Sequence, residues 1–283
     1  MKPAIPFGAI AALFLFTIRQ MLRDVKFWAV AASLFLPCAL ALLIQHFHPP
    51  IKDLAPAWHL YHGLSQFMFL MGLLPLACMI YGTGLIGTEA ESTTIGYLIT
   101  RRLHRGTVLL TKFAATALVL IAACAVATAA IYACVVFRLD WEALAPKSAA
   151  LAHWTPANEL KVYLIVTALG VIGFLSIFSL IGLLTAKPLA ISVLYMVVVE
   201  LVISNLPARA RAYSLIHQLR VSAAAEIPRL VRLFELPSDL GEQLFPADGS
   251  GVPEVLMASA AALLLSCALV SIRELIPSKV ARD

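Results

Sequence analysis

Six stretches of the chain are apolar over the length that a helix needs to cross a bilayer, which is roughly 20 residues. They cover residues 27–44, 64–86, 108–137, 162–186, 188–204 and 255–272. Pro75 lies inside the second stretch, where a local kink or a neighbouring helix can satisfy the carbonyl that proline frees. The pattern predicts an all-α membrane protein with six transmembrane helices.

A shorter apolar run precedes these stretches. Residues 7–18 carry no charge, and Arg19, Arg23 and Lys26 follow them. The run is too short to span, so we expect an amphipathic helix over residues 7–24 that lies at the membrane interface. A signal peptide is the alternative, but basic residues stand where a small-residue cleavage site would be needed.

Composition strengthens the membrane interpretation. Hydrophobic residues make up 61% and charged residues 13%, whereas soluble domains are about half apolar and a quarter charged. The net charge of +5 is not gathered into the basic patch that nucleic-acid binding needs. All five cysteines lie within apolar runs, so no disulfide framework is expected.

Lysine and arginine also predict orientation. With the N-terminus in the cytoplasm, the basic clusters at 19–26 and 101–112 and the basic tail after residue 272 fall on the cytoplasmic side. Most of the remaining basic residues fall in one long loop, 205–253, where they weigh less in the positive-inside rule. Both termini are therefore expected in the cytoplasm, and the protein in the cell inner (plasma) membrane as a multi-pass chain.

The long outer loop contains its own periodic pattern. Apolar residues recur at near-helical spacing over residues 215–236, and Pro228 interrupts them. Two short amphipathic helices that dip back toward the membrane would produce this pattern. A solvated loop is the alternative.

Glu200 is the one formal charge deep in an apolar stretch. An intramembrane carboxylate is costly unless it is paired, protonated or hydrated, so it is a candidate functional residue. Two roles remain open. Glu200 either closes the outer end of the bundle through an ion pair or hydrogen bond, or it lies on a substrate pathway.

The segment between the second and third stretches is charged and reads EAESTTIGYLITRRLHRGTVLLTK, from Glu89 to Lys112. Ser92, Thr93 and Thr94 can cap a short helix that has an apolar side and a basic end. We expect a cytoplasmic hinge over residues 89–107. It is either a docking element for a partner protein or a simple positive-inside anchor.

This hinge resembles the corresponding segment of the ABC-2 type permeases of ABC transporters. The pattern is matched by Glu89, Glu91, Ser92, Thr94, Ile95, Tyr97, Leu98, Ile99, Thr100, Arg105 and Lys112, with Thr93 where glycine is usual and Arg102 where proline is usual. The six stretches, the N-terminal helix and Glu200, which is followed by polar residues, are also similar to that family. The whole chain would then be a single ABC-2 type transmembrane domain.

The resemblance implies a bacterial permease subunit, working as an exporter, that pairs with a second permease chain or with its own copy. A separate ABC ATPase subunit would bind the ATP and Mg, so the chain itself would bind no cofactor and would not be an enzyme. The absence of a G-x-x-x-x-G-K-[ST] motif agrees with this division of labour. Coupling to the ATPase would involve Glu89, Glu91, Thr94, Tyr97, Leu98, Arg101, Arg102 and Arg105.

The sequence leaves two other kinds of function open. An intramembrane enzyme or assembly factor needs polar residues that converge at one depth, and the polar residues of the stretches are scattered along the sequence. A non-catalytic membrane scaffold would use the hinge only for docking. His46, His48, His59 and His62 have spacings that can bind a metal in a first outer loop, but no other ligand types support them, so we expect no metal site and no catalytic residues.

Overall fold

The computed structural model describes residues 7–47, 60–91, 105–136, 156–205, 209–227 and 251–272. Throughout these residues the regular elements are helices, and no strand occurs among them. Six helical segments are long and apolar enough to cross a membrane, which confirms the predicted number. We call them spans 1 to 6: Val25–Phe47, Leu60–Leu85, Gly106–Val136, Asn158–Leu184, Pro188–Asn205 and Val252–Ser271.

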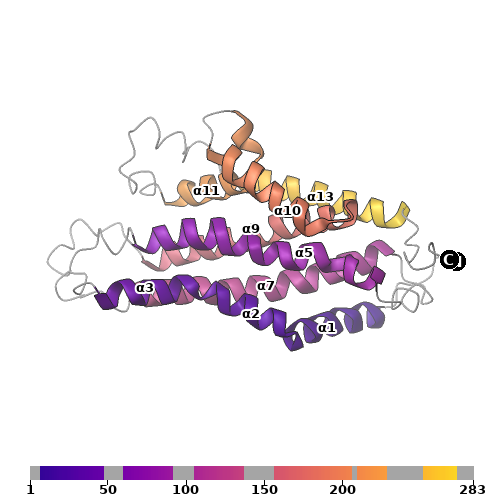
Figure 1. The fold of residues 1–283 in the computed structure, drawn as a ribbon, viewed down its shortest axis with the longest axis horizontal. Helices are drawn as coiled ribbons and strands as arrows, with labels where there is room; N and C mark the ends of the chain where they lie inside the picture. Colours follow the sequence, from indigo (N-terminus) through magenta and orange to yellow (C-terminus); the bar gives the residue numbers. More distant parts are fainter. Residues whose placement is uncertain are drawn as a thin grey trace.

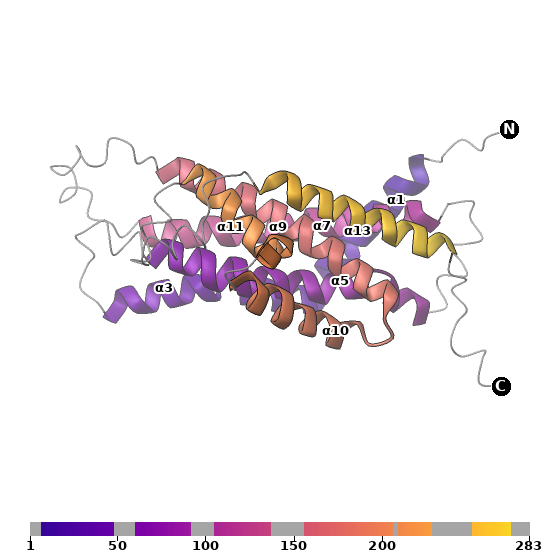
Figure 2. The same cartoon turned by 90° about the horizontal axis from the view of Figure 1, so that it is seen from above.

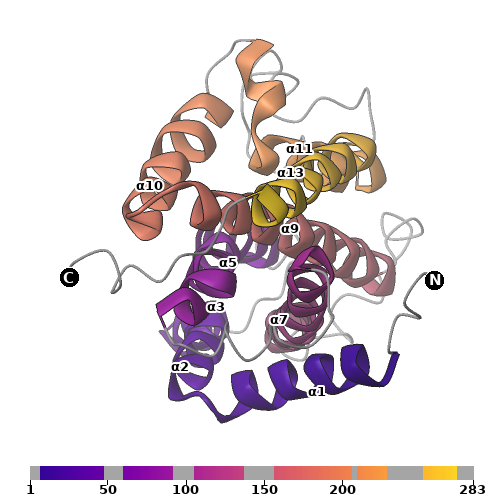
Figure 3. The ribbon, with the colours of Figure 1, turned by 90° about the vertical axis from the view of Figure 1, so that its right-hand side faces the viewer.

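The N-terminal helix meets span 1 at a corner. Helix α1 (Phe7–Arg23) stops before Asp24, whose side chain accepts a hydrogen bond from Lys26 N at 3.0 Å and caps α2 (Val25–Leu34). Trp28 Nε1 donates to the Leu22 carbonyl across this corner. Figure 3 looks along the bundle and shows α1 running across it rather than along it. The direction of α1 suits an interfacial helix, and its position at a membrane surface stays a prediction.

Proline shapes spans 1 and 2. Helix α3 (Leu36–Phe47) continues span 1 after a break at Phe35, just before Pro37. Span 2 consists of a turn at 60–63, the π-helical segment η1 (Leu64–Leu73) and α5 (Leu74–Glu91). A proline ring in an α-helix collides with the carbonyl four residues earlier. The wide turns of η1 end at Leu73, two residues before Pro75, and accommodate this ring.

Helix α9 (Pro156–Leu184) is the centre of the bundle. It packs against α5, α7 (Arg105–Val136), α11 (Leu215–Glu226) and α13 (Val252–Ile272), and Figure 3 shows it among them. Span 5 follows a short turn and consists of α10 (Pro188–Tyr195), the π-helical η3 (Met196–Val202) and the 3-10 turn η4 (Ile203–Asn205). A second 3-10 turn, η5 (Arg209–Tyr213), leads into α11.

Spans 2 and 4 approach each other closely where α5 meets α9. A Cβ atom on Gly82 would meet the Phe178 Cβ at 2.7 Å, and one on Gly182 would meet the Thr83 carbonyl oxygen at 2.7 Å. Small residues let helix backbones approach in this way, and in lipid such packing is a main source of helix association. The two glycines therefore fix spans 2 and 4 as one unit.

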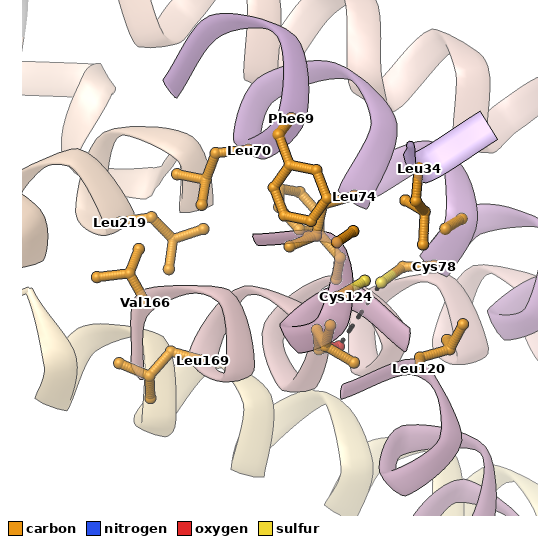
Figure 4. Packing of buried hydrophobic residues seen from close by; sticks show 14 of the residues in the cluster. Leu34, Phe69, Leu70, Leu74, Cys78, Leu120, Cys124, Val166, Leu169 and Leu219 are labelled. Atoms are coloured by element: carbon orange, nitrogen blue, oxygen red, sulfur yellow. Dashed lines mark hydrogen bonds between the residues drawn. The ribbon is translucent and has the colours of Figure 1, made fainter. Parts of the chain in front are cut away.

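Buried apolar side chains from several helices meet around this unit. Figure 4 shows Leu34, Phe69, Leu74, Leu120, Val166 and Leu219 converging from different elements, with Cys78 and Cys124 among them. Large apolar side chains also lie exposed on the six spans, including Trp28, Phe67, Leu118, Ile165, Leu201 and Leu264. A soluble protein rarely exposes so much apolar surface, so this outer face is suited to lipid.

The two ends of the bundle differ. Figures 1 and 2 place α11 at the end where α3 finishes and α9 begins. Helix α1 lies at the opposite end, where α5 finishes and α7 begins. Of the two helices predicted over residues 215–236, the first is α11, and most of the second lies outside the described residues.

Replacing Gly182 with alanine is expected to destabilise the protein by about 1–3 kcal/mol, the usual cost of overpacking. The new methyl group would press on the Thr83 backbone, which cannot move aside as a flexible side chain can. Thermal unfolding of the purified protein in detergent measures the effect. Gly63→Ala is the matched control, because a Cβ there meets nothing within 4 Å; equal stability of the two variants would contradict the packing argument.

Candidate functional site

The predicted coupling residues fall at the edge of the described structure. Glu89 and Glu91 lie in the last turns of α5 and Arg105 is the first residue of α7. Thr94, Tyr97, Leu98, Arg101 and Arg102 lie outside the described residues. Their role in coupling stays a prediction.

Glu200 is fully buried and its carboxylate accepts four hydrogen bonds. Oε1 accepts from the Tyr195 hydroxyl at 2.6 Å and from Leu215 N at 3.1 Å. Oε2 accepts from the Ser214 hydroxyl at 2.7 Å and from Ile216 N at 2.9 Å. Every partner donates, so all four hydrogen bonds use the acceptor capacity of the two carboxylate oxygens.

These donors gather at Glu200 because α11 begins there. Ser214 is the N-cap of α11, and its hydroxyl oxygen also accepts from His217 N at 3.2 Å. The first N–H groups of a helix have no partner within the helix, and the helix dipole favours a negative charge at this end. Leu215 and Ile216 supply two such N–H groups, so a carboxylate from span 5 completes the start of a helix from a different part of the chain.

Arg220 forms a second link between the same elements. It is almost completely buried, with 3% of its surface exposed. Its guanidinium donates to Asn205 Oδ1 at 3.1 Å and to the Met71 sulfur at 2.9 Å. Arg220 therefore ties α11 to the end of span 5 and to η1 of span 2.

The charges around α11 influence one another. Burial lowers the pKa of Arg220 to about 10, and Glu200 acts in the opposite direction; Arg220 thus stays charged at neutral pH. Burial, together with the nearby charges of Arg211 and Arg220, lowers the pKa of His217 to about 4. The site consequently holds one carboxylate and one guanidinium, with a neutral imidazole beside them.

The Glu200 site adds to the packing of span 5, whose helix α10 also contacts α9 and α5. Only 17% of the most apolar stretch of span 5 is buried inside the protein. This is the lowest share among the six candidate spans described. Glu200 is nevertheless 0% exposed, because α11 covers it. The Glu200 network can therefore hold span 5 and α11 together and close this end of the bundle, which is one of the two roles considered from the sequence.

A second group of buried polar residues lies at the same end. His62 Nδ1 is 2.6 Å from the Tyr163 hydroxyl, and His62 Nε2 is 3.5 Å from Glu159 Oε2. His62 was expected in a loop, but it lies in the helical turn that opens span 2, and His46 lies in α3. No three His, Cys, Asp or Glu side chains are grouped for a metal ion in the part of the chain that the structure describes.

Sequence reasoning found the first of these centres and missed the second. Glu200 attracted notice as a charge inside an apolar stretch, and the N-cap Ser214 marks a helix start. Glu159 and Tyr163 are four residues apart, one turn along α9, which is the signal that could have identified them as a pair. Their partner His62 is distant in sequence and gave no local signal.

A family model described as "Protein of unknown function (DUF2705)" matches residues 15–223, and the chain belongs to this family. No curated protein matches the sequence. The assignment to the ABC-2 type permeases, as a single ABC-2 transmembrane domain, is therefore wrong. Six spans are common to many membrane proteins, and the hinge motif was short and departed from the pattern at Thr93 and Arg102.

Glu200→Gln is expected to destabilise the purified protein by about 3 kcal/mol, because an amide NH2 would face donors that now bond a charged oxygen. Tyr195→Phe removes one donor and leaves the carboxylate in place, so a smaller loss of about 1 kcal/mol is expected. Thermal unfolding in detergent gives both values. Glu254→Gln, at an exposed acid in the first turn of α13, is the control; a similar loss in that variant would refute a specific role for Glu200.

Acid is expected to weaken the protein through His217. Its pKa is about 4 in the folded protein against an ordinary 6.5, so the unfolded chain binds the proton more tightly. The stability that neutral His217 contributes is fully present above about pH 6.5 and is lost as the pH falls toward 4.

Thermal unfolding of wild type and His217→Gln between pH 7 and pH 4 measures this contribution as the difference between the two curves. The variant should lose less stability on acidification than wild type. His46→Gln, at an exposed histidine near the end of α3, should follow the wild-type curve. Parallel curves for wild type and His217→Gln would show that His217 does not contribute.

Proposed function

We propose that this member of the DUF2705 family is the membrane-spanning subunit of a transporter in the cell inner membrane, with both termini in the cytoplasm. A separate ATPase docks on the hinge at residues 89–107 and supplies the energy. The observation that carries the proposal is the Glu200 network, which holds α11 inside one end of the bundle. We place this end on the outer side.

The position of α11 suits a gate. It packs against α9, α13, η1 and η3, which belong to spans 4, 6, 2 and 5. Polar residues of this short helix, among them His217, Arg220 and Ser222, are buried. A helix in this position blocks the end of the bundle, and release of its N-terminus from Glu200 would unblock it.

Span 2 provides a route from the proposed ATPase to this gate. Its helices run from Glu91, at the start of the hinge, to Met71 and beyond. Met71 contacts Arg220 of α11. Rigid helix movement is a common way to transmit a conformational change, and here movement of span 2 at the hinge would reach α11 through this contact.

The sequence supports an external energy source. It contains no phosphate-binding loop of the Walker type, so the ATP and Mg are assigned to the partner chain. Pairing with a second permease chain, and export as the direction, complete the proposal.

An intramembrane enzyme is the competing proposal, and the cluster around His62 is the feature closest to it. A serine nucleophile needs its general base within hydrogen-bond reach. Ser65 is buried and lies close to His62 in the sequence. Its hydroxyl, however, has no hydrogen-bond partner within the described structure. Among the described residues, Ser65 and His62 therefore do not form a hydrogen-bonded pair of nucleophile and base.

The docking proposal predicts that a Walker-type ATPase co-purifies with the chain from its native membrane in mild detergent. Combined Arg101→Glu, Arg102→Glu and Arg105→Glu substitutions should abolish this recovery by reversing the basic end of the hinge. Lys161→Glu reverses an exposed charge at the opposite end of the bundle and should leave recovery unchanged.

Cysteine labelling in intact cells checks the orientation that this requires. His104→Cys should resist a membrane-impermeant reagent, and Lys161→Cys should react with it. Labelling of His104→Cys, or recovery of the ATPase by the triple variant, would overturn the proposed docking.

A further inference from the structure

A cleft of about 190 Å³ lies between α9, α11 and α13. These three helices contact one another, and Figures 2 and 3 show them side by side at the end of the bundle where α9 begins. One stripe of α9, from Asn158 to Leu169, forms the long wall of the cleft, and α11 and Val252 of α13 form the others. Among the described residues that line it are neither Glu200 nor its hydrogen-bond donors, so the cleft is separate from that network.

The α9 wall changes from polar to apolar along its length. Asn158 and Lys161 lie in the first turns of α9 and are exposed. Val162, Val166 and Leu169 follow at helical spacing and are buried. Because a helix rises 1.5 Å per residue, the wall is roughly 16 Å long. The cleft therefore has a polar mouth at the end of the bundle and an apolar floor that runs toward its middle.

The cleft is open along one side. Ile165 and Ala225 line it and are exposed, Ile165 by 50%. Its volume is below the roughly 300–1,000 Å³ of pockets that enclose a small molecule. Since Ile165 belongs to span 4, the open side lies along the surface that is suited to lipid. A groove of this size and position fits part of a hydrocarbon chain and does not enclose a whole molecule.

Charge at the mouth favours an anion. A lysine such as Lys161 can lay its stem on apolar surface and hold its ammonium at the level of the headgroups. Helix α13 begins at Val252, and the first N–H groups of a helix attract negative charge. Two acids are near in sequence, but neither is among the described residues that line the cleft. Glu159 is buried and lies against His62 of span 2, and Glu254 is exposed on α13.

We propose that this cleft binds one anionic phospholipid from the membrane leaflet at this end of the bundle. Lys161 binds the phosphate at the mouth, and an acyl chain lies along Val162, Val166 and Leu169. The apolar floor alone would accept any hydrocarbon chain, so Lys161 is the residue that selects the headgroup. The site goes beyond the proposed transport function and does not depend on it. The cleft lies at the opposite end of the bundle from the hinge, so loss of the lipid should leave docking at the hinge unchanged.

Native mass spectrometry of the full chain in mild detergent tests this proposal, because it counts both the lipids and the chains in each complex. The probes are phosphatidylglycerol, which is anionic, and phosphatidylcholine, which is zwitterionic, with the same acyl chains. Wild type should bind one phosphatidylglycerol about fivefold more tightly than phosphatidylcholine, the usual effect of one basic residue next to anionic lipid. Glycerol phosphate, which has no acyl chain, should bind at least about tenfold more weakly than phosphatidylglycerol, because it cannot use the apolar floor.

Substitutions of Lys161 test the headgroup site. Lys161→Glu should abolish the preference for phosphatidylglycerol, and Lys161→Arg should keep it because the positive charge remains. Lys187→Glu is the matched control. It reverses another exposed lysine, which lies just beyond the other end of α9, and should keep the wild-type preference.

A substitution at Ala225 tests the apolar part. Ala225→Phe places a ring in the cleft and should weaken binding of both lipids at least about tenfold by filling the space for the chain. Ala258→Phe adds the same ring at an exposed alanine of α13 that is not among the residues lining the cleft. It should bind both lipids as wild type does.

The proposal fails if wild type binds the two lipids equally, or if the preference survives in Lys161→Glu. Equal binding of glycerol phosphate and phosphatidylglycerol would make the mouth a simple anion site and would also overturn it. Wild type without bound lipid would show that protein covers the cleft. The covering segment would be a second copy if the complex contains two chains, and another part of the same chain otherwise. Should Ala225→Phe not fold, the Lys161 variants decide the outcome.

Discussion

Inside a bilayer no water is present to satisfy a polar group, so every buried donor and acceptor must find its partner within the protein. The Glu200 carboxylate shows how this constraint organises the bundle. Its four donors come from span 5 itself and from the start of α11. Neither part is complete alone, because without α11 the carboxylate keeps only the Tyr195 donor, and without span 5 the N–H groups of α11 lack an acceptor. This mutual need positions a peripheral span that has little buried apolar surface of its own.

The two polar centres share a backbone feature. Glu200 lies in the π-helical segment η3, and Gln66 lies in the π-helical segment η1, just after His62. Such wide turns are rare and occur frequently at functional sites. In η1 the neighbouring Pro75 explains why the helix widens. The segment η3 contains no proline. There the wider helical turns occur together with the four hydrogen bonds to Glu200.

Hydropathy predicted the six spans because each span is one continuous segment of the sequence. A segment that faces lipid must be mostly apolar along its whole length. Glu200 was conspicuous for the same reason, as a charge where lipid tolerates few. The His62 cluster was not predictable in this way, since His62 and Tyr163 are 101 residues apart in sequence and meet only after spans 2 and 4 pack. The placement of His62 in a loop hid it further. The family assignment failed for a related reason, because topology and a short hinge pattern are weaker evidence than a match over most of the chain.

Span 2 connects the two centres. Its first turns carry His62 and Gln66 against α9, and Met71 further along the same helix contacts Arg220 of α11. The close contacts at Gly82 and Gly182 fix the other half of this span to α9, so any adjustment near His62 falls on η1 rather than on α5. A shift of η1 would therefore act on the Arg220 contact. Because coupling between two sites is reciprocal, release of α11 would in turn act on η1 and on the packing of its first turns against α9.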